Sequence, residues 1–474
     1  MVYKGNTPSF AHAAITFLAI VMVIGIGLFG FNVSLHSLML VCLTIAAISA
    51  WLLNKNGFGP IRAAMNEGIS SAFGAIYIFI LIGVLIAAFI QAGTVGTLIY
   101  YGVQFISPAV FLPTGIILCI FMSVATGTSW GTAGTAGIVL IGIGDAIGIP
   151  LPIVAGAIVS GACFGDKMSP VSDTTVLAAM SAKTDIYSHI KSMTYTTVPT
   201  LVLVLIISTG ISMQYADNLL PADRLNGLLT ALDTKYTINL ICLLPFAVMI
   251  GLILLKVAAE PAMVAASATA VLIAIVMQGF DPVVVLNALH SGGAGDTGVK
   301  TLDSLLSRGG IASMMWTLSL ALMALALGGI LNAFGFLRVL IVTVLDRVKS
   351  AFGLVTSTIL ACLVGNMTMG EAYMSIILGG QLFGPAYDDA GVDRRVLSRS
   401  LEEGATLTTT LIPWTTGGAF FATTLGVNVI DYAPWALLNW INPLVGMLFA
   451  YFGLGLFQNN KQRLIKKPEI ASAS

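Results

Sequence analysis

The sequence predicts an all-α polytopic membrane protein built from two inverted five-span repeats, each with a re-entrant helical hairpin and a broken transmembrane helix. Of its 474 residues, 57% are hydrophobic and only 9% are charged, and the mean hydropathy is +0.97. Soluble domains carry about a quarter charged residues. Apolar stretches of the roughly 20 residues that cross a bilayer recur along the chain. Polar interruptions fall at corresponding places in its two halves.

Composition also excludes several classes of function. Lys plus Arg and Asp plus Glu each number 21, so the net charge is zero and we expect no nucleic-acid partner. The Cys residues number 5, lie far apart in apolar stretches and show no metal-binding spacing. The sequence shows no combination of nucleophile and base, and no metal-binding pattern, that would predict an enzyme. We also expect no cofactor. The start of the chain shows no cleavage site, which predicts an uncleaved first span.

The two halves show the same order of predicted elements. The first has spans near 11–31, 35–53 and 70–91, an amphipathic piece, an apolar region at 109–142, and spans near 149–182 and 194–215. The second has spans near 237–256, 261–280 and 311–333, an amphipathic piece, an apolar region at 352–384, and spans near 396–424 and 434–458. The predicted units are repeats 1–215 and 237–458, a connection at 216–236 and a cytoplasmic tail at 459–474.

Basic residues predict the orientation, because Lys and Arg concentrate in short cytoplasmic loops. With both termini inside, these residues fall inside: Lys55, Arg62, Lys183, Lys191, Arg338, Arg347, Lys349, Arg394, Arg395 and Arg399. This arrangement requires 109–142 and 352–384 each to enter and leave on one side, so both are predicted to be re-entrant hairpins. The odd number of crossings per repeat then inverts the second copy.

Short sequence similarities agree with two copies. "AAFIQAGTVGTLI" (87–99) resembles "GGILNAFGFLRVL" (328–340), and "EGISSAF" resembles "GGIASMM". Inverted repeats whose broken elements meet at the membrane midplane are typical of secondary transporters. Irregular backbone at that depth requires protein or a water-filled cavity around it.

Four polar segments are the predicted breaks. The first hairpin tip is "ATGTSWGTAGTAG" (125–137), and the next span is interrupted at "GDKMSPVSDTT" (165–175). The second tip is "GNMTMGEA" (365–372), and its following span is interrupted at "TLTTTLIPWTTGGAF" (406–420). Pro170 and Pro413 are expected to break the two spans, because proline removes an N–H and clashes with the preceding turn.

Asp166 and Asp173 are the strongest candidates for ion binding, and Glu371 at the second tip is the third. A charged side chain at the bilayer centre costs at least about 2.5–3.5 kcal/mol and indicates a functional site. A carboxylate can hold Na⁺ or a proton, and mutually exclusive occupancy is enough for exchange. We expect Na⁺ at Asp173 and Asp166. Further oxygen ligands are expected from Thr128, Ser129, Thr132, Ser169, Ser172 and Thr174, and in the second half from Asn366, Thr368, Thr409, Thr410, Thr415 and Thr416.

Other assignments stay open at this point. Lys167 would compensate the acidic charge, or form a structural ion pair with Asp166 or Asp173. Any of the hydroxyls could simply bond its own helix. Trp130 and Trp414 suit gating and packing equally. Glu402 and Glu403 are expected to form an interfacial pair beside Arg399, and His189 to be a solvated loop residue.

The motifs "GTSWGTAGTAG", "GDKMSPVSDTT" and "IPWTTGGAF", in this order and spacing, resemble the NhaC family of bacterial Na⁺/H⁺ antiporters over nearly the whole chain. The resemblance implies a multi-pass secondary transporter of the bacterial inner membrane that exchanges Na⁺ and H⁺. The resemblance also implies that the ion site includes Asp166, Asp173, Ser169 and Thr174. It also implies an alternative, since the family includes malate/lactate-type antiporters.

We therefore expect Na⁺/H⁺ exchange, with transport of small carboxylates coupled to the same ions as the alternative. An organic dianion needs compensating positive charge, from basic side chains or helix N-termini. Only Lys167 supplies a basic side chain in the predicted core. We expect membrane lipid to surround the protein. The sequence leaves open whether the protein forms a homodimer.

Overall fold

The computed structural model describes residues 7–53, 57–70, 73–105, 107–170, 172–216, 222–255, 257–293, 295–299, 302–303, 306–345, 348 and 350–457. Helices make up most of this part of the chain, and it contains no strand. The expectation of an all-helical chain is confirmed. The basic residues Lys55, Arg347 and Lys349 and the tail at 459–474 lie outside the described residues.

The first half begins with α1 and ends with the long helix α11. Its elements are α1 (Phe10–Gly25), α2 (Leu35–Leu53), α3 (Gly59–Ser70), α4 (Phe73–Gln91), α5 (Thr94–Phe105), α6 (Phe111–Thr126), α7 (Ser129–Thr132), α8 (Ile138–Ala146), α9 (Leu151–Met168), α10 (Asp173–Ala182) and α11 (Ile186–Met213). Short π-helical turns extend α1 through Gly30 and join α7 to α8.

The second half begins after the helix α12 (Ala222–Lys235), which occupies most of the predicted connection. Its elements are α13 (Leu244–Leu254), α14 (Ala259–Val276), α15 (Pro282–Ser291), α17 (Ile311–Ala333), α18 (Phe336–Leu345), α19 (Ala351–Met369), α20 (Ala372–Asp389), α21 (Arg394–Gly404), α22 (Thr406–Thr409), α23 (Thr416–Leu425), α24 (Val429–Tyr432) and α25 (Leu437–Tyr451).

Within the described residues, 7 helices are long and apolar enough to cross a membrane, or up to 10 if each bent pair forms one span. Large apolar side chains such as Leu18, Trp51 and Ile206 are exposed on these helices. Such side chains have no favourable contact with water, whereas lipid tails suit them. The molecule is therefore a multi-pass membrane protein.

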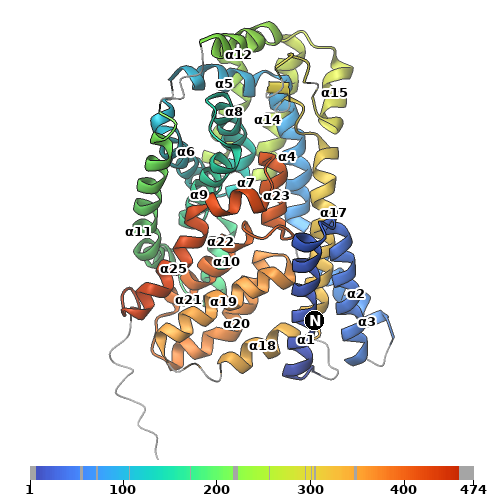
Figure 1. Cartoon of the computed structure of the whole chain (residues 1–474), viewed down its shortest axis with the longest axis vertical. Coiled ribbons are helices and arrows are strands. Elements are labelled where there is room, and N and C mark those ends of the chain that lie inside the picture. Colours follow the sequence, from blue (N-terminus) through green and yellow to red (C-terminus); the bar gives the residue numbers. More distant parts are fainter. Residues whose placement is uncertain are drawn as a thin grey trace, which may run out of the picture.

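The hairpin regions lie at opposite ends of the molecule. In Figure 1, α6 and α8 occupy the upper half, whereas α19 and α20 occupy the lower half. The short helices that precede them, α5 and α18, lie at the upper and lower ends respectively. Between these ends, α9, α10, α21, α22 and α23 bring their breaks to the middle (Figure 1).

Each hairpin packs against the neighbouring broken helix at one close crossing. Helix α6 crosses α9 at Gly161, where an added Cβ would lie 2.5 Å from the Ile116 carbonyl oxygen. Helix α19 crosses α21 at Gly404, where an added Cβ would lie 2.6 Å from the Ile359 carbonyl oxygen. Small residues at such crossings let membrane helices approach to backbone contact.

Polar side chains bridge the same two crossings. Ser123 Oγ on α6 donates to the Ala162 carbonyl at 2.7 Å. Asn366 Nδ2 on α19 donates to the Ala405 carbonyl at 2.6 Å. Both bonds connect a hairpin arm to the broken helix directly beyond its glycine, and so fix the height of each hairpin tip relative to each break.

The crossing at Gly161 gives the first prediction. Gly161→Ala should lower the free energy of unfolding by about 1–3 kcal/mol, because the added methyl group overlaps backbone atoms that cannot move aside. The matched control is Gly210→Ala on α11, where an added Cβ meets nothing within 4 Å. Thermal unfolding of both variants in detergent measures the effect. Equal melting temperatures would contradict the close crossing.

Candidate functional site

The four broken elements enclose a cavity of about 60 Å³ in the middle of the molecule. A water molecule needs about 10–15 Å³ of such space, so the cavity holds a few water-sized ligands. The 15 residues that line it come from both halves of the chain: Ile78, Thr128, Ser129, Trp130, Asp166, Asp173, Thr174, Glu371, Ala372, Tyr373, Thr406, Thr409, Thr410, Thr416 and Gly417.

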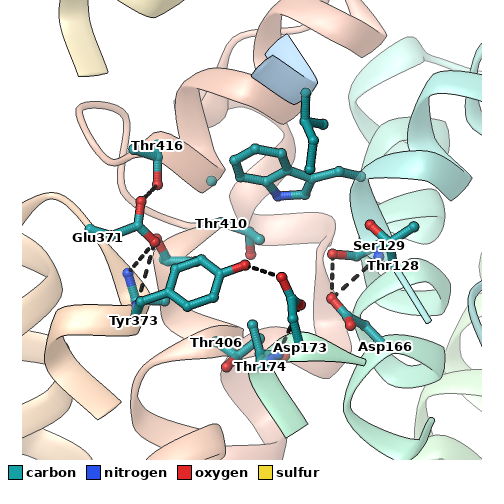
Figure 2. Close-up of a pocket in the computed structure, with 15 residues that line it drawn as sticks. Thr128, Ser129, Asp166, Asp173, Thr174, Glu371, Tyr373, Thr406, Thr410 and Thr416 are labelled. Carbon is teal, nitrogen blue, oxygen red and sulfur yellow. Dashed lines mark hydrogen bonds between the residues drawn. The ribbon is translucent and has the colours of Figure 1, made fainter. Parts of the chain in front are cut away.

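Asp166 lies near the end of α9 and is only 5% exposed. Its Oδ2 accepts hydrogen bonds from Ser129 Oγ at 2.7 Å and from the Ser129 backbone N–H at 3.2 Å. Its Oδ1 accepts one from Ser172 Oγ at 2.5 Å. The first hairpin tip and the following break thus both donate to one carboxylate (Figure 2).

Asp173 begins α10, and its side chain is exposed to the cavity. Its Oδ1 accepts a hydrogen bond from the Thr174 N–H at 2.8 Å. Its Oδ2 accepts one from the phenol of Tyr373, which comes from the second half of the chain. Figure 2 shows the Tyr373 ring reaching across the cavity to this carboxylate. This bond directly connects the two halves at the site.

Glu371 caps the N-terminus of α20 and is 2% exposed. The preceding residue, Gly370, has a φ of +68°, which reverses the chain at the tip. Glu371 Oε1 then accepts the Ala372 N–H at 2.9 Å and the Tyr373 N–H at 3.4 Å, while Oε2 accepts Thr416 Oγ1 at 2.5 Å. Glu371 therefore holds the second hairpin tip against the second break.

Both prolines lie inside the breaks that the sequence predicts. Helix α9 ends at Met168, Pro170 follows, and α10 starts with Ser172 as its N-cap. Helix α22 ends at Thr409, Pro413 follows, and α23 starts with Thr415 as its N-cap. Each break therefore places backbone amides and hydroxyls inside the molecule.

Several predicted ligands bond elsewhere and do not line the cavity. Ser169 Oγ donates to the Val124 carbonyl at 2.8 Å, and Thr132 Oγ1 to the Thr128 carbonyl at 3.0 Å. Thr368 bonds its own helix, Thr415 Oγ1 donates to the Thr409 carbonyl, and Asn366 bridges α19 to α21. The cavity brings together Thr128, Ser129, Asp166, Asp173, Thr174, Glu371, Thr409, Thr410 and Thr416.

Lys167 is 0% exposed and does not line the cavity. Its ammonium has no hydrogen-bond partner in the part of the chain that the structure describes. Its strongest interactions with charged groups are with Glu403 and Glu402, and that with Asp166 is weaker. Lys167 is therefore not a direct counter-charge at the cavity wall.

Two expectations about charged and polar residues were wrong. Glu402 and Glu403, expected at the interface with water, are 0% exposed, because α21 is enclosed by α11, α19, α20 and α25. His189, expected in solvent, is also 0% exposed, and its Nδ1 lies 2.5 Å from Ser398 Oγ. Helix α11 begins at Ile186 and carries His189 into this interior.

The sequence did not single out Tyr373 or Thr406, although both line the cavity. Tyr373 follows the capping Glu371 by two positions at a hairpin tip, and this is the signal that could have identified it. Trp130 also lines the cavity and stacks on Phe420 at 4.5 Å, so it closes one wall. Trp414 instead donates its Nε1–H to the Met367 carbonyl at 2.8 Å.

Comparison with known proteins identifies the family. The model of the Na⁺/H⁺ antiporter family matches residues 7–216 and 161–454. The chain is 37% identical over 430 residues to the Na⁺/H⁺ antiporter NhaC of Alkalihalophilus pseudofirmus, covering 90% of this chain and 92% of that relative. The chain belongs to the Na⁺/H⁺ antiporter family. The resemblance to NhaC is therefore confirmed.

Other relatives are named for different substrates. This chain is 36% identical to the malate-2H⁺/Na⁺-lactate antiporter of Bacillus subtilis, and the match covers 92% of this chain and 95% of the relative. It is 33% identical to the arginine/ornithine antiporter ArcD of Halobacterium salinarum, covering 96% of this chain and 94% of the relative. Family membership alone therefore leaves the transported substrate to be argued from the site.

The capping role of Glu371 gives the second prediction. Glu371→Ala should lower the free energy of unfolding by about 1 kcal/mol, as expected for the loss of a helix N-cap. Glu371→Gln keeps the Oε1 acceptor and should therefore unfold at a higher temperature than Glu371→Ala. Thermal unfolding in detergent compares the two variants. An alanine variant as stable as the wild type would show that the cap contributes nothing.

Proposed function

We propose that this protein is a secondary transporter of the bacterial cell membrane that exchanges Na⁺ for H⁺ by alternating access. The ions compete for Asp166 and Asp173, with Glu371 completing the acidic wall. The observation that carries the proposal is a small cavity whose ionisable lining groups include three carboxylates and, among the described residues, no Lys or Arg side chain.

Two inverted repeats support alternating access. The pairs Gly127 and Gly370, Gly161 and Gly404, and Pro170 and Pro413 each have the same separation in the sequence. Both members of the first pair end a hairpin helix with a φ of +68°. The matched crossings and the opposite placement of the hairpins agree with this correspondence (Figure 1). The proposed topology has both termini in the cytoplasm.

The hydrogen bonds indicate how the two ions exchange. Hydroxyl and amide donors occupy both oxygens of Asp166 and of Asp173. A bound Na⁺ needs those carboxylate oxygens as ligands, and the hydroxyls of Ser129 and Ser172 can rotate to present their own oxygens. A proton on the carboxyl group removes the charge that attracts Na⁺. Occupancy by one ion therefore excludes the other.

Carboxylate transport is the second candidate, because a relative is a malate-2H⁺/Na⁺-lactate antiporter and several half-helix N-termini face the cavity. However, the amides at these ends already donate to the protein's own carboxylates at Asp166, Asp173 and Glu371. An added dianion would meet three acidic groups without a cationic side chain among the described lining residues. The site favours a small cation.

Transport by purified protein in liposomes separates these candidates. A Na⁺ gradient is imposed and the internal pH is followed with a fluorescent dye, without organic solutes and then with malate, lactate or arginine. We expect Na⁺ alone to drive proton movement in the opposite direction. Proton movement that requires one of the organic solutes would overturn simple Na⁺/H⁺ exchange.

The third prediction concerns Asp173. Asp173→Asn should abolish Na⁺-driven proton flux while the protein remains folded, because the amide neither ionises nor binds a proton. The matched control is Asp185→Asn, which keeps the N-cap acceptor of α11 at an exposed position outside the cavity. The control should retain the wild-type flux in the same liposomes. Retained flux in the Asp173 variant would remove this residue as the shared ligand.

A further inference from the structure

A second group of charges lies buried beside the cavity. Lys167 on α9 and Arg399, Glu402 and Glu403 on α21 are all 0% exposed. Charged side chains at this depth require partners, since the cost of burying an unpaired ion is several kcal/mol. Among the described residues, the hydrogen bonds divide the four residues into a pair whose side chains have partners and a pair whose charged groups have none.

Arg399 and Glu403 form the bonded pair, although Arg399 Nε and Nη2 and Glu403 Oε2 have no hydrogen-bond partner among the described residues. Glu403 Oε1 accepts hydrogen bonds from Thr196 Oγ1 at 2.6 Å and from Asn442 Nδ2 at 3.3 Å, and lies 3.8 Å from Arg399 Nε. Arg399 also donates to the Gly455 carbonyl at 3.1 Å. These contacts connect α21 to α11 and α25, so this pair has a structural explanation.

Glu402 and Lys167 remain without such an explanation. Among the described residues, neither oxygen of the Glu402 carboxyl group has a hydrogen-bond partner, and neither does the Lys167 ammonium. The Thr406 hydroxyl, one turn further along, interacts with Glu402 without an aligned hydrogen bond and also lines the cavity. A fully buried carboxylate without a donor is costly, whereas a protonated carboxyl group is neutral.

The surroundings of Glu402 connect it electrostatically to the cation site. Glu402 interacts with Asp166 and Lys167 on α9 and with Asp173 on α10. Other buried ionisable groups on the elements packed around α21 include His189 on α11, Cys362 on α19 and Tyr387 on α20, with Arg399 and Glu403 on α21 itself. Asp166 and Asp173 therefore act on Glu402 through charge, without contact.

We propose that Glu402 is a second proton-carrying group of this transporter, separate from the carboxylates that hold the cation. When the cation site has released its own proton and holds no cation, the negative charges of Asp166 and Asp173 keep the proton on Glu402. When Na⁺ binds between them, its positive charge favours release of that proton to water, and Lys167 balances the resulting Glu402 carboxylate. Binding of Na⁺ and loss of this proton then favour each other.

This inference rests on the proposed function and extends it. Competition at the cation site and release from Glu402 together give more than one proton for each Na⁺. The exchange would then move net charge and respond to the membrane potential. A structural role for Glu402 would not produce this coupling.

The test measures protons released when Na⁺ is added to purified protein in weakly buffered detergent containing a pH indicator. Na⁺-dependent thermal stabilisation of the same samples reports how much Na⁺ binds. Glu402→Gln should bind Na⁺ but release about one proton fewer per Na⁺, since one ionisable group contributes at most one. Lys167→Met should also lose this proton, because the Glu402 carboxylate then lacks its counter-charge. Glu260→Gln, which lies outside both groups on α14, should match the wild type.

Two further variants keep the test decisive. Glu402→Leu replaces the carboxyl group with an apolar side chain of similar size, and this variant should also release about one proton fewer per Na⁺. Glu402→Asp keeps a carboxyl group and should release as many protons as the wild type. Wild-type proton release from both Glu402→Gln and Glu402→Leu would overturn the inference. A wild-type protein that neither gains stability nor releases protons with Na⁺ would instead contradict the proposed function itself.

Discussion

One constraint explains the rest of the structure: the carboxylates inside the molecule need hydrogen-bond donors. Asp166 and Glu371 are almost fully buried and Asp173 faces the cavity, and each is held by amides or hydroxyls at the start of a half-helix. A continuous helix has no free amide in its middle. The chain therefore breaks where the acids lie, and the glycine crossings bring these breaks to one cavity.

The arrangement also explains why the two halves differ chemically while matching in backbone. Each half supplies a hairpin tip that ends at a left-handed glycine and a helix broken near a proline. The first half places aspartates in its broken helix, whereas the second places its acid, Glu371, at the hairpin tip. Tyr373 and Thr416 connect these groups across and within the halves. A cation in the cavity would therefore act on both halves together.

Much of this arrangement could be predicted from the sequence. Hydropathy identified the helices, and Pro170 and the charges around it identified a break, because both features are costly in a continuous membrane helix. The burial of Glu402, Glu403 and His189 could not be predicted, since each lies near a basic residue at the end of an apolar stretch, and only the packing of α11, α19, α20 and α25 shows that this end is enclosed. Tyr373 was missed for a similar reason, because the aspartate that it contacts belongs to the other half.

Cryo-electron microscopy at alkaline pH, with and without Na⁺, tests the central claim most directly. The account predicts that Na⁺ adds density between the carboxylates of Asp166 and Asp173, in contact with oxygens from the first hairpin tip. It also predicts that the bond from the Tyr373 phenol to Asp173 changes when the ion is bound. Maps in which bound Na⁺ lies elsewhere, while both carboxylates keep the donors seen here, would contradict a shared site for Na⁺ and H⁺.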